Sequence, residues 1–214
     1  MDQREIAFSF SARYFMDGGI TPDTRQIWFV LHGYGQLAKY FLKKFNVLRS
    51  KGICVVAPEG LSRFSLEPGS GRPNDRVGAT WMTKENRAMD IANYVRYLDK
   101  VYHDVNGDHR IPTTILGFSQ GSATASRWAL SKNITFERLI LWAGVFPADM
   151  DLKVGKETLK DKDVVLVYGS KDPFLTESGF GEMKALTTHA GITTTEIVFE
   201  GGHEIDDQTL LRFA

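Results

Sequence analysis

The sequence predicts an α/β fold with a mostly parallel central sheet of about seven strands, covered by helices on both faces. Short runs of β-branched and aromatic residues alternate with longer segments of helical periodicity. Several of the short runs are apolar at every position, which is typical of parallel strands that are buried on both faces. No repeat, low-complexity tract or linker divides the 214 residues, so we expect one domain over residues 1–214.

Seven segments are expected to form strands. They are residues 6–14, 27–31, 53–57, 113–116, 139–142, 164–168 and 195–199. The first strand is expected to be antiparallel, because only a short turn-like segment separates it from the second. The long stretch 58–80 is rich in Gly, Pro, Ser and Arg, and we expect it to be irregular, either functional or a plain surface excursion.

Helical periodicity marks three segments between these strands. Their apolar positions are Leu37, Phe41, Phe45 and Leu48; Ile91, Val95, Leu98 and Tyr102; and Phe180, Met183 and Ala190. Gly52 and Gly191 are placed to end the first and third helices, and Thr83 is the expected N-cap of the second.

Charge and composition narrow the class of protein. Lys and Arg number 26 and Asp and Glu number 26, so no basic excess favours nucleic acid as a partner. The N-terminal residues lack a signal-like apolar region, and no apolar stretch approaches the roughly 20 residues that span a bilayer. We therefore expect a cytoplasmic protein without stable membrane insertion. Cys54, the single cysteine, lies in an apolar run and is expected to be a buried strand residue.

Residues 117–121 read Gly-Phe-Ser-Gln-Gly between a predicted strand and a predicted helix. A strand, a sharp turn and a helix are the context of the nucleophile elbow of α/β hydrolases, in which a serine stands at the tip of a strained turn. An ordinary glycine-flanked serine in a βα turn is the alternative. The context favours Ser119 as a nucleophile.

A base and an acid are expected in later loops, in the chain order serine, acid, histidine. Asp172 follows the predicted strand 164–168, and His203 follows the last predicted strand. His203 would accept the proton of Ser119, and Asp172 would orient the imidazole. The remaining histidines fit less well: His32 precedes the nucleophile, and His103, His109 and His189 lie near helix ends where solvation is expected.

The turn after the predicted strand 27–31 reads His-Gly-Tyr-Gly. In this fold a loop at that place supplies one N–H of the oxyanion hole, and the residue after the nucleophile supplies the other. We expect the backbone N–H groups of Tyr34 and Gln120 to be these donors, and His32 to be a buried scaffold residue.

Four motifs now stand in order. They are Leu-His-Gly-Tyr-Gly at 31–35, Gly-Phe-Ser-Gln-Gly at 117–121, Gly-Ser-Lys-Asp-Pro at 169–173 and Gly-Gly-His-Glu-Ile at 201–205. Together they resemble the phospholipase/carboxylesterase family, which includes acyl-protein thioesterases and small bacterial carboxylesterases. The resemblance covers the chain from about residue 25 and implies an α/β-hydrolase fold without a large cap, ester or thioester hydrolysis, and neither metal nor cofactor.

Two departures from the family pattern bear on the substrate. Gln36 stands where the family often has Asp, and Trp81-Met82-Thr83 replaces a Trp-Phe-Asp-like segment. Trp81 is expected either to line the substrate site or to be a core tryptophan, and Phe146 is expected at the rim with Tyr34. Only about twenty residues separate the strands 139–142 and 164–168, too few for a helical cap. An open site favours small or medium acyl groups.

Several functions stay open on the sequence alone. The leading hypothesis is a carboxylesterase that acts on a small-molecule ester. A thioesterase or a lysophospholipase would use the same triad, whereas a peptidase is less favoured for so short a chain. A catalytically silent binding protein of the same fold would lack a triad or oxyanion element, and all are present here. The chain could be a monomer or a homodimer.

Overall fold

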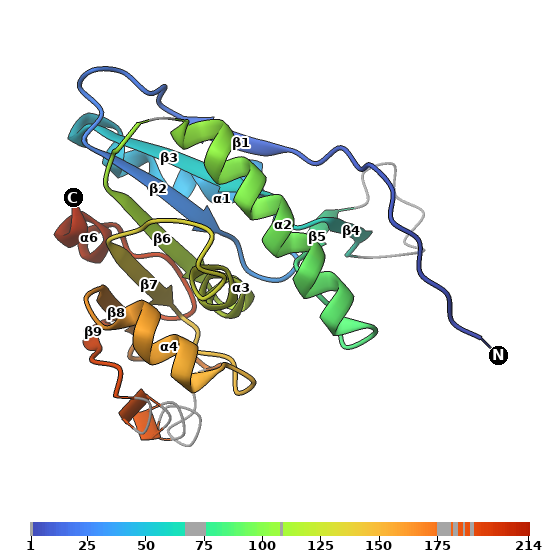
Figure 1. The fold of residues 1–214 in the computed structure, drawn as a ribbon. Coiled ribbons are helices and arrows are strands. Elements are labelled where there is room, and N and C mark those ends of the chain that lie inside the picture. Colours follow the sequence, from blue (N-terminus) through green and yellow to red (C-terminus); the bar gives the residue numbers. More distant parts are fainter. Residues whose placement is uncertain are drawn as a thin grey trace.

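A seven-stranded sheet forms the centre of the computed structural model, which describes residues 2–66, 76–107, 109–174, 181, 184–185, 187–188 and 191–214. The strands lie in the order β1-β3-β2-β6-β7-β8-β9 (Figure 1). Their bounds are β1 Tyr14–Asp17, β2 Gln26–Leu31, β3 Ile53–Pro58, β6 Thr113–Phe118, β7 Arg138–Trp142, β8 Asp163–Gly169 and β9 Thr195–Phe199. Every neighbouring pair is parallel except β1 and β3. The predicted fold class is confirmed.

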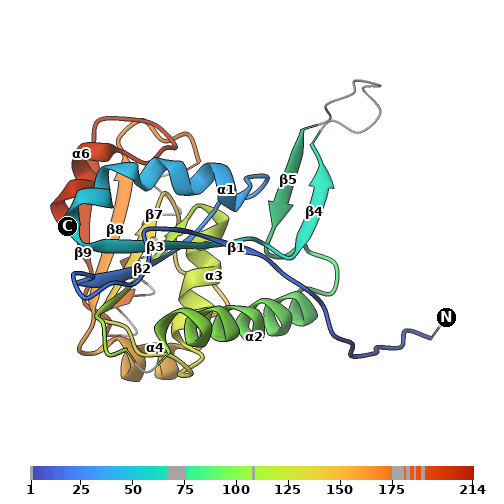
Figure 2. The same ribbon diagram turned by 90° about the horizontal axis from the view of Figure 1, so that it is seen from above.

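Helices cover both faces of this sheet (Figure 2). One face carries α1 Ala38–Phe41, its 3-10 continuation Leu42–Lys51, α6 Asp207–Leu210 and the 3-10 turn Leu211–Phe213. The other carries α2 Arg87–Asn106, α3 Gln120–Ala129 and α4 Leu152–Leu159. Alternate residues of β2 face opposite layers: Phe29 packs with Trp128 of α3, while Trp28 and Val30 belong to the core beneath α1. This alternation explains why the central strands are apolar throughout.

Strand register brings the functional loops to one edge of the sheet. Leu31 at the end of β2 lies opposite Gly117 in β6, and Phe118 lies opposite Trp142 at the end of β7. On the outer side, Gly169 at the end of β8 lies opposite Phe199 at the end of β9. Because these strands are parallel, the loops that follow β2, β6, β8 and β9 leave the sheet at its carboxyl edge.

The first predicted strand was misplaced. Residues 6–13 form no strand, and β1 begins at Tyr14, opposite Pro58 at the end of β3. Upstream of Tyr14, the carbonyl of Arg13 accepts the N–H of Glu59 at 3.3 Å, and residues 6–12 extend past the end of β3 without a backbone hydrogen bond to any described residue. β1 is antiparallel, as expected, but its partner is β3 rather than the following strand β2.

The stretch 58–80 was expected to be irregular, and in part this prediction was wrong. It contains an antiparallel hairpin of β4 Ser62–Ser65 and β5 Val77–Thr80, which projects from the body of the molecule (Figure 2). Both strands are four residues long, and each has a single large apolar residue, Phe64 in β4 and Val77 in β5, so neither carries a readable alternation of apolar residues.

Two of the expected helix boundaries can be compared with the structure. Gly52 ends the first helical segment with φ +70°, as predicted. The second helix begins at Arg87 after Asn86, so the prediction of Thr83 as its N-cap was wrong. The Thr83 hydroxyl instead accepts the N–H of Glu85 at 3.2 Å in a turn before the helix. Phe180, Met183 and Ala190, which marked the third predicted helix, lie outside the described residues.

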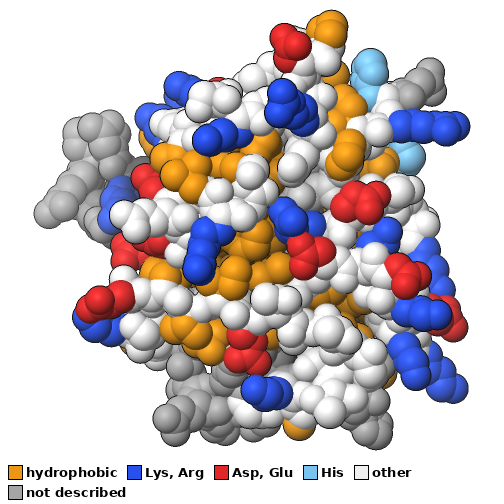
Figure 3. Space-filling model, turned by 90° about the vertical axis from the view of Figure 1, so that its left-hand side faces the viewer, with side chains coloured by type: hydrophobic (Ala, Val, Ile, Leu, Met, Phe, Trp, Pro, Cys, Tyr) orange, Lys and Arg blue, Asp and Glu red, His pale blue; other side chains and the backbone are white. Residues whose placement is uncertain are grey.

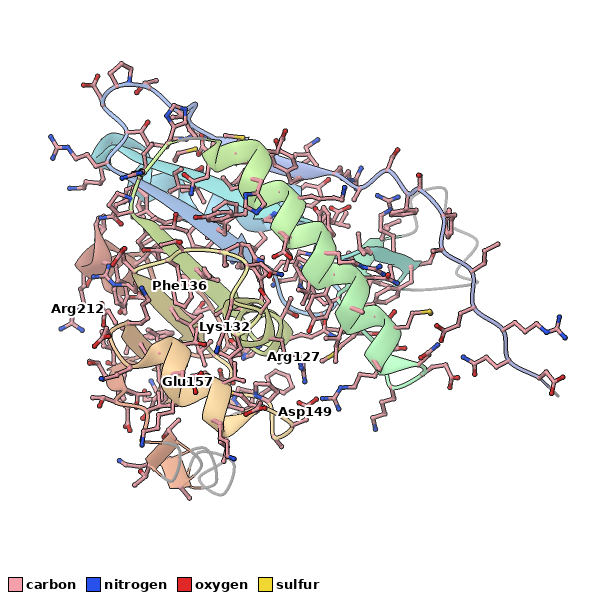
Figure 4. The ribbon with its side chains drawn as sticks, viewed as in Figure 1. Arg127, Lys132, Phe136, Asp149, Glu157 and Arg212 are labelled. Carbon is pink, nitrogen blue, oxygen red and sulfur yellow. The ribbon has the colours of Figure 1, made fainter. Side chains whose placement is uncertain are left out.

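Ion pairs connect α3 and the segment that follows it to neighbouring elements (Figure 4). Arg127 of α3 meets Asp149 at 2.7 Å, and Lys132, just after α3, meets Glu157 of α4 at 2.8 Å. On the face shown in Figure 3, basic and acidic side chains intermingle, in keeping with a net charge of zero. Within the described ranges, no helix combines the length and the apolar character needed to cross a bilayer.

Candidate active site

Ser119 occupies a strained turn between β6 and α3. Its φ is +54° and its ψ is −118°, a backbone conformation that residues with a side chain rarely adopt. Its N–H donates to the carbonyl of Trp142 at 2.9 Å, which ties the turn to the neighbouring strand β7. The geometry is that of the predicted nucleophile elbow, with the serine at the N-terminus of α3.

The two glycines of the motif permit this close approach of strand and helix. A Cβ at Gly117 would lie inside van der Waals contact with the carbonyl of Gly121, and a Cβ at Gly121 would overlap the carbonyl oxygen of Leu31 in β2. Backbone atoms cannot give way cheaply at either place. The two glycines of the Gly-Phe-Ser-Gln-Gly motif are therefore required by backbone packing, whether or not Ser119 is catalytic.

Asp172 and His203 meet at the carboxyl edge of the sheet. Nδ1 of His203 lies 2.8 Å from Oδ2 of Asp172, whose side chain is fully buried while that of His203 is 20% exposed. The other carboxylate oxygen, Oδ1, accepts the N–H of Phe174 at 2.9 Å. Because a carboxylate only accepts, Nδ1 of His203 carries a proton and donates it to this bond. The loops after β8 and β9 thus hold a histidine–carboxylate pair in which Nε2 is left as the free ring nitrogen.

Two phenyl rings bracket the imidazole of His203. The ring of Phe118, the residue before Ser119, lies 4.9 Å from it, centroid to centroid, and the ring of Phe174 lies 4.7 Å away. Phe118 comes from the elbow and Phe174 from the loop of Asp172. The histidine is therefore packed between the predicted nucleophile's strand and the predicted acid's loop.

His32 is a buried scaffold residue, as expected from sequence. Its Nε2 accepts the N–H of Gly60 at 2.9 Å, so Nδ1 carries the proton and donates to the carbonyl of Gly33 at 2.8 Å. Burial lowers the pKa of His32, which keeps the ring neutral near pH 7. A neutral imidazole with both nitrogens engaged fixes the start of the loop that carries Tyr34.

The loop after β2 is held at its other end by Gln36. The side-chain oxygen Oε1 of Gln36 accepts the N–H of Gly33 at 2.9 Å. The N–H of Gly35 donates to the carbonyl of Ala79 in β5 at 2.9 Å, and the carbonyl of Gln36 accepts the N–H of Ala79 at 3.1 Å. The loop is thus pinned on both sides of Tyr34.

The loop approaches the elbow closely. A Cβ at Gly33 would lie 3.2 Å from Cβ of Ser119, so a side chain there would press against the serine. Among the described residues no group accepts the N–H of Tyr34. Gln120 is the first residue of α3, so its N–H has no partner within the helix. The structure thus shows no acceptor for either N–H among the described residues, and their role as oxyanion donors stays a prediction.

The side chain of Gln120 has a structural role that sequence reasoning missed. Its Nε2 donates to Oγ1 of Thr80 at 2.9 Å and to the carbonyl of Met82 at 3.0 Å, while its Oε1 accepts the N–H of Trp81 at 3.2 Å. The amide therefore fastens the elbow to the segment that follows β5. These partners are about forty residues away in sequence, and no local sequence pattern predicts them.

Trp81 and Phe146, expected at the substrate rim, are core residues with 2% and 3% exposure. Trp81 donates from Nε1 to the carbonyl of His32 at 2.8 Å, and its ring lies 5.0 Å from that of His32. A role in substrate binding stays a prediction for both. Tyr34 is 61% exposed, with its ring 5.2 Å from that of Phe64 in β4. His103 and His109 are exposed, and His189 lies outside the described residues.

Comparison with solved structures supports the fold. Maize (Zea mays) acyl-protein thioesterase 2 is 15% identical, with a TM-score of 0.72 over 95% of this chain and 96% of that one. Esterase PE8 is 20% identical, with a TM-score of 0.66 over 95% and 98% of the two chains. The Bacillus cereus carboxylesterase is 15% identical, with a TM-score of 0.66 over 94% and 91%. At these identities the likeness is one of fold.

A comparison with curated proteins found no match. The family model of phospholipases and carboxylesterases, in contrast, matches residues 20–213. That match covers the elbow, the Asp172–His203 pair and the loop of Tyr34. With its seven-stranded, mostly parallel sheet, the chain has an α/β-hydrolase fold, and it belongs to the phospholipase/carboxylesterase family of esterase- and thioesterase-type hydrolases.

Proposed function

We propose that this protein hydrolyses carboxylic esters of small or medium acyl groups with Ser119 as nucleophile, His203 as base and Asp172 as orienting acid. The observation that carries the proposal is the 2.8 Å pair between His203 and the buried Asp172, packed through Phe118 against the strained turn of Ser119. A strained, positive-φ serine beside a fixed base–acid pair is the arrangement that acyl transfer requires.

The chemistry runs in two halves. In the first, Nε2 of His203 takes the proton of Ser119 while Oγ attacks the acyl carbon, and a tetrahedral intermediate forms. The C–O bond to the leaving group then breaks, and the imidazolium returns the proton to the departing alcohol. In the second half, a water molecule loses its proton to His203, attacks the acyl-enzyme, and the carboxylic acid leaves as Oγ is protonated again.

The oxyanion of each intermediate would be held by the N–H groups of Tyr34 and Gln120. Both donors are fixed before the reaction, Tyr34 by the bonds on either side of it and Gln120 by the hydrogen bonds of its side chain. Fixed donors stabilise developing charge without reorganisation, and one such donor is worth about 10²–10³ in rate.

The surroundings of Ser119 favour a shallow, open acyl site. Residues 143–162 lie between β7 and β8, all of them described, and their one helix, α4, packs on a face of the sheet rather than over its edge (Figure 2). The exposed rings of Tyr34 and Phe174 stand near the site. A thioester is the second candidate substrate, favoured by the structural likeness to maize acyl-protein thioesterase 2.

Labelling with a fluorophosphonate probe tests the nucleophile. Wild type should be labelled and Ser119→Ala should not, while Ser126→Ala, which alters another serine of the same helix, should be labelled like wild type. Absence of labelling in correctly folded wild type would contradict an active serine.

A panel of p-nitrophenyl esters and acyl-thioesters tests the substrate. Rates should be highest for short and medium chains. A maximum at palmitate would contradict the open site, and thioester rates well above ester rates at equal chain length would favour the second candidate.

A further inference from the structure

Residues 2–12 form an extended arm that leaves the sheet beyond β1 and passes beside α2, with Glu5 within 3.4 Å of Asn86 at the start of that helix (Figures 1 and 2). Arg13 anchors its base: the guanidinium meets the buried carboxylate of Glu59 at 2.7 Å, and the carbonyl accepts the hydroxyl of Tyr97 at 2.7 Å. Beyond this anchor, no backbone hydrogen bond to a described residue holds residues 5–12.

The arm carries three large apolar side chains that are mostly exposed. Ile6 is 88% exposed, Phe8 77% and Phe10 57%. The rings of Phe8 and Phe10 meet edge to face with centroids 6.4 Å apart, so both lie on one side of the extended segment. The small residues Ala7 and Ser9 alternate with them. One apolar side on an extended segment is the pattern of a strand that is built to be buried against something.

A trough runs between this arm and α2, with a cavity volume of about 960 Å³. The apolar side chains of the arm line one wall of this trough, and Leu61, Trp81 and Met89 line the other, while the charges at its border are mixed. The exposed fractions of Ile6, Phe8 and Phe10 show that the arm borders this trough without filling it. The trough is thus left open between its two apolar walls.

We propose that the arm of one copy lies in the trough of a second copy, and that reciprocal exchange of arms about a two-fold axis makes this protein a homodimer. Such an exchange is closed, because each copy gives one arm and accepts one, so it ends at two chains. The family match begins at residue 20, so the proposed contact is made by a segment that lies outside the part shared with the family.

The area available suits a stable dimer. Large apolar side chains bury about 150–250 Å² each, so Ile6, Phe8 and Phe10 at their exposed fractions offer on the order of 400 Å² per arm. Two arms and two troughs of comparable area give roughly 1,600 Å² in total, the size of a standard specific interface.

Charge also favours a second copy as the occupant. The arm carries Asp2 and Glu5, which are opposite in sign to Arg96 and Lys100 of α2, and Glu5 also borders the trough of its own chain. Within one chain, the carboxylate of Glu5 is met by the side-chain amide of Asn86 at 3.4 Å. The trough also contains Asp90, which would face Arg4 of an incoming arm. A surface of mixed charge suits a protein segment better than an anionic lipid.

Light scattering after size-exclusion chromatography at micromolar concentrations tests the dimer. Wild type should have twice the chain mass, and the double variant Phe8→Ser/Phe10→Ser should have the mass of one chain. Val198→Ser, which removes an exposed apolar side chain from the opposite sheet edge β9, should leave the dimer intact. Ester hydrolysis by the arm variant should stay within about twofold of wild type, because the arm is remote from Ser119. A wild-type monomer would overturn the proposal.

Cross-linking tests the arm itself. Ser9→Cys and Asn93→Cys are prepared as separate proteins, mixed, and treated with a short bismaleimide. A mixed covalent dimer forms only if the arm of one chain reaches α2 of another. Cys54 does not interfere, since it is buried. A dimer that persists in Phe8→Ser/Phe10→Ser and yields no mixed cross-link would show that another surface joins the copies. Neither readout depends on the proposed hydrolase activity.

Discussion

The side-chain oxygen of Gln36 accepts the N–H of Gly33 at 2.9 Å, three residues back along the chain. This bond closes the loop that carries Tyr34, the proposed oxyanion donor. An amide at this position supplies the acceptor without placing a negative charge beside the proposed oxyanion site.

Replacing Gln36 should therefore affect the rate more than binding. In Gln36→Leu the buried N–H of Gly33 loses its acceptor, and we expect kcat on p-nitrophenyl acetate to fall about tenfold, with KM within about twofold. Gln36→Glu keeps the acceptor but adds charge and should also lower kcat. Gln26→Leu is the matched control, because Gln26 accepts from Trp28 Nε1 at 2.9 Å far from the site. Equal kcat in Gln36→Leu and Gln26→Leu would contradict this role.

The Asp172 carboxylate accepts from both His203 and the backbone of Phe174. Asp172→Asn should keep the fold but reverse the preferred tautomer of His203, and kcat should fall by about 10³–10⁴. Asp163→Asn changes a carboxylate at the opposite end of β8, where it pairs with Arg138, and should leave kcat near wild type. Near-normal activity of Asp172→Asn would show that another group is the acid.

Phe174 covers one side of His203 and is 73% exposed. A phenyl ring against an imidazolium stabilises the positive charge by about 0.5–1 kcal/mol at an exposed site, so Phe174→Leu should lower kcat about two- to fivefold. Phe174→Tyr keeps the aromatic face and should restore the wild-type rate. If the Leu and Tyr variants have equal kcat, the ring serves packing alone.

Gly121 should be required for stability as well as for the elbow. A methyl group there would overlap the carbonyl of Leu31, so Gly121→Ala should lower the free energy of unfolding by about 1–3 kcal/mol in urea titrations. Gly19→Ala is the control, since a Cβ at Gly19 has no neighbour within 4 Å. Similar unfolding midpoints for the two variants would contradict the close packing of α3 on β2.

Burial raises the pKa of the Cys54 thiol to about 11. The thiol should therefore react slowly with a thiol reagent at pH 8 and quickly once the chain is unfolded in urea. The unfolded thiol ionises near its ordinary pKa of 9, below the folded value. Ionisation consequently favours the unfolded chain, and the free energy of unfolding should decline as the pH rises from 9 towards 11. Fast labelling of folded protein at pH 8 would show that Cys54 is accessible.

The central strands and the turn at Ser119 could be predicted from the sequence because the patterns that mark them lie within a few consecutive residues. Apolar runs such as 53–57 sit between turn residues, and the glycines around Ser119 reflect a steric need within five residues. The pairing of Asp172 with His203 could be anticipated because parallel strands deliver successive loops to one edge. The first strand was misread because Ile6, Phe8 and Phe10 alternate like strand residues, whereas strand formation also needs a partner, and β3 ends at Pro58.

The connections made by Gln120 could not be predicted for a different reason. Its amide is satisfied by Thr80, Trp81 and Met82, a segment that reads as an irregular loop in the sequence. Hydrogen bonds over such separations depend on the assembled fold, and a single sequence gives no sign of which side chain will meet which backbone.

Within the described part of the chain, the hydrogen bonds of the Gln120 side chain end at the base of the β4–β5 hairpin, where Thr80 closes β5 and the chain returns to the body. Ser65 and Val77, which pair at the other end of the two strands, take no part in these bonds. Exchanges at Ser65 and Val77 should therefore leave the elbow's fastening untouched. The hairpin is therefore a place where relatives can diverge, or an engineer can graft a new segment, while the reacting groups keep their geometry.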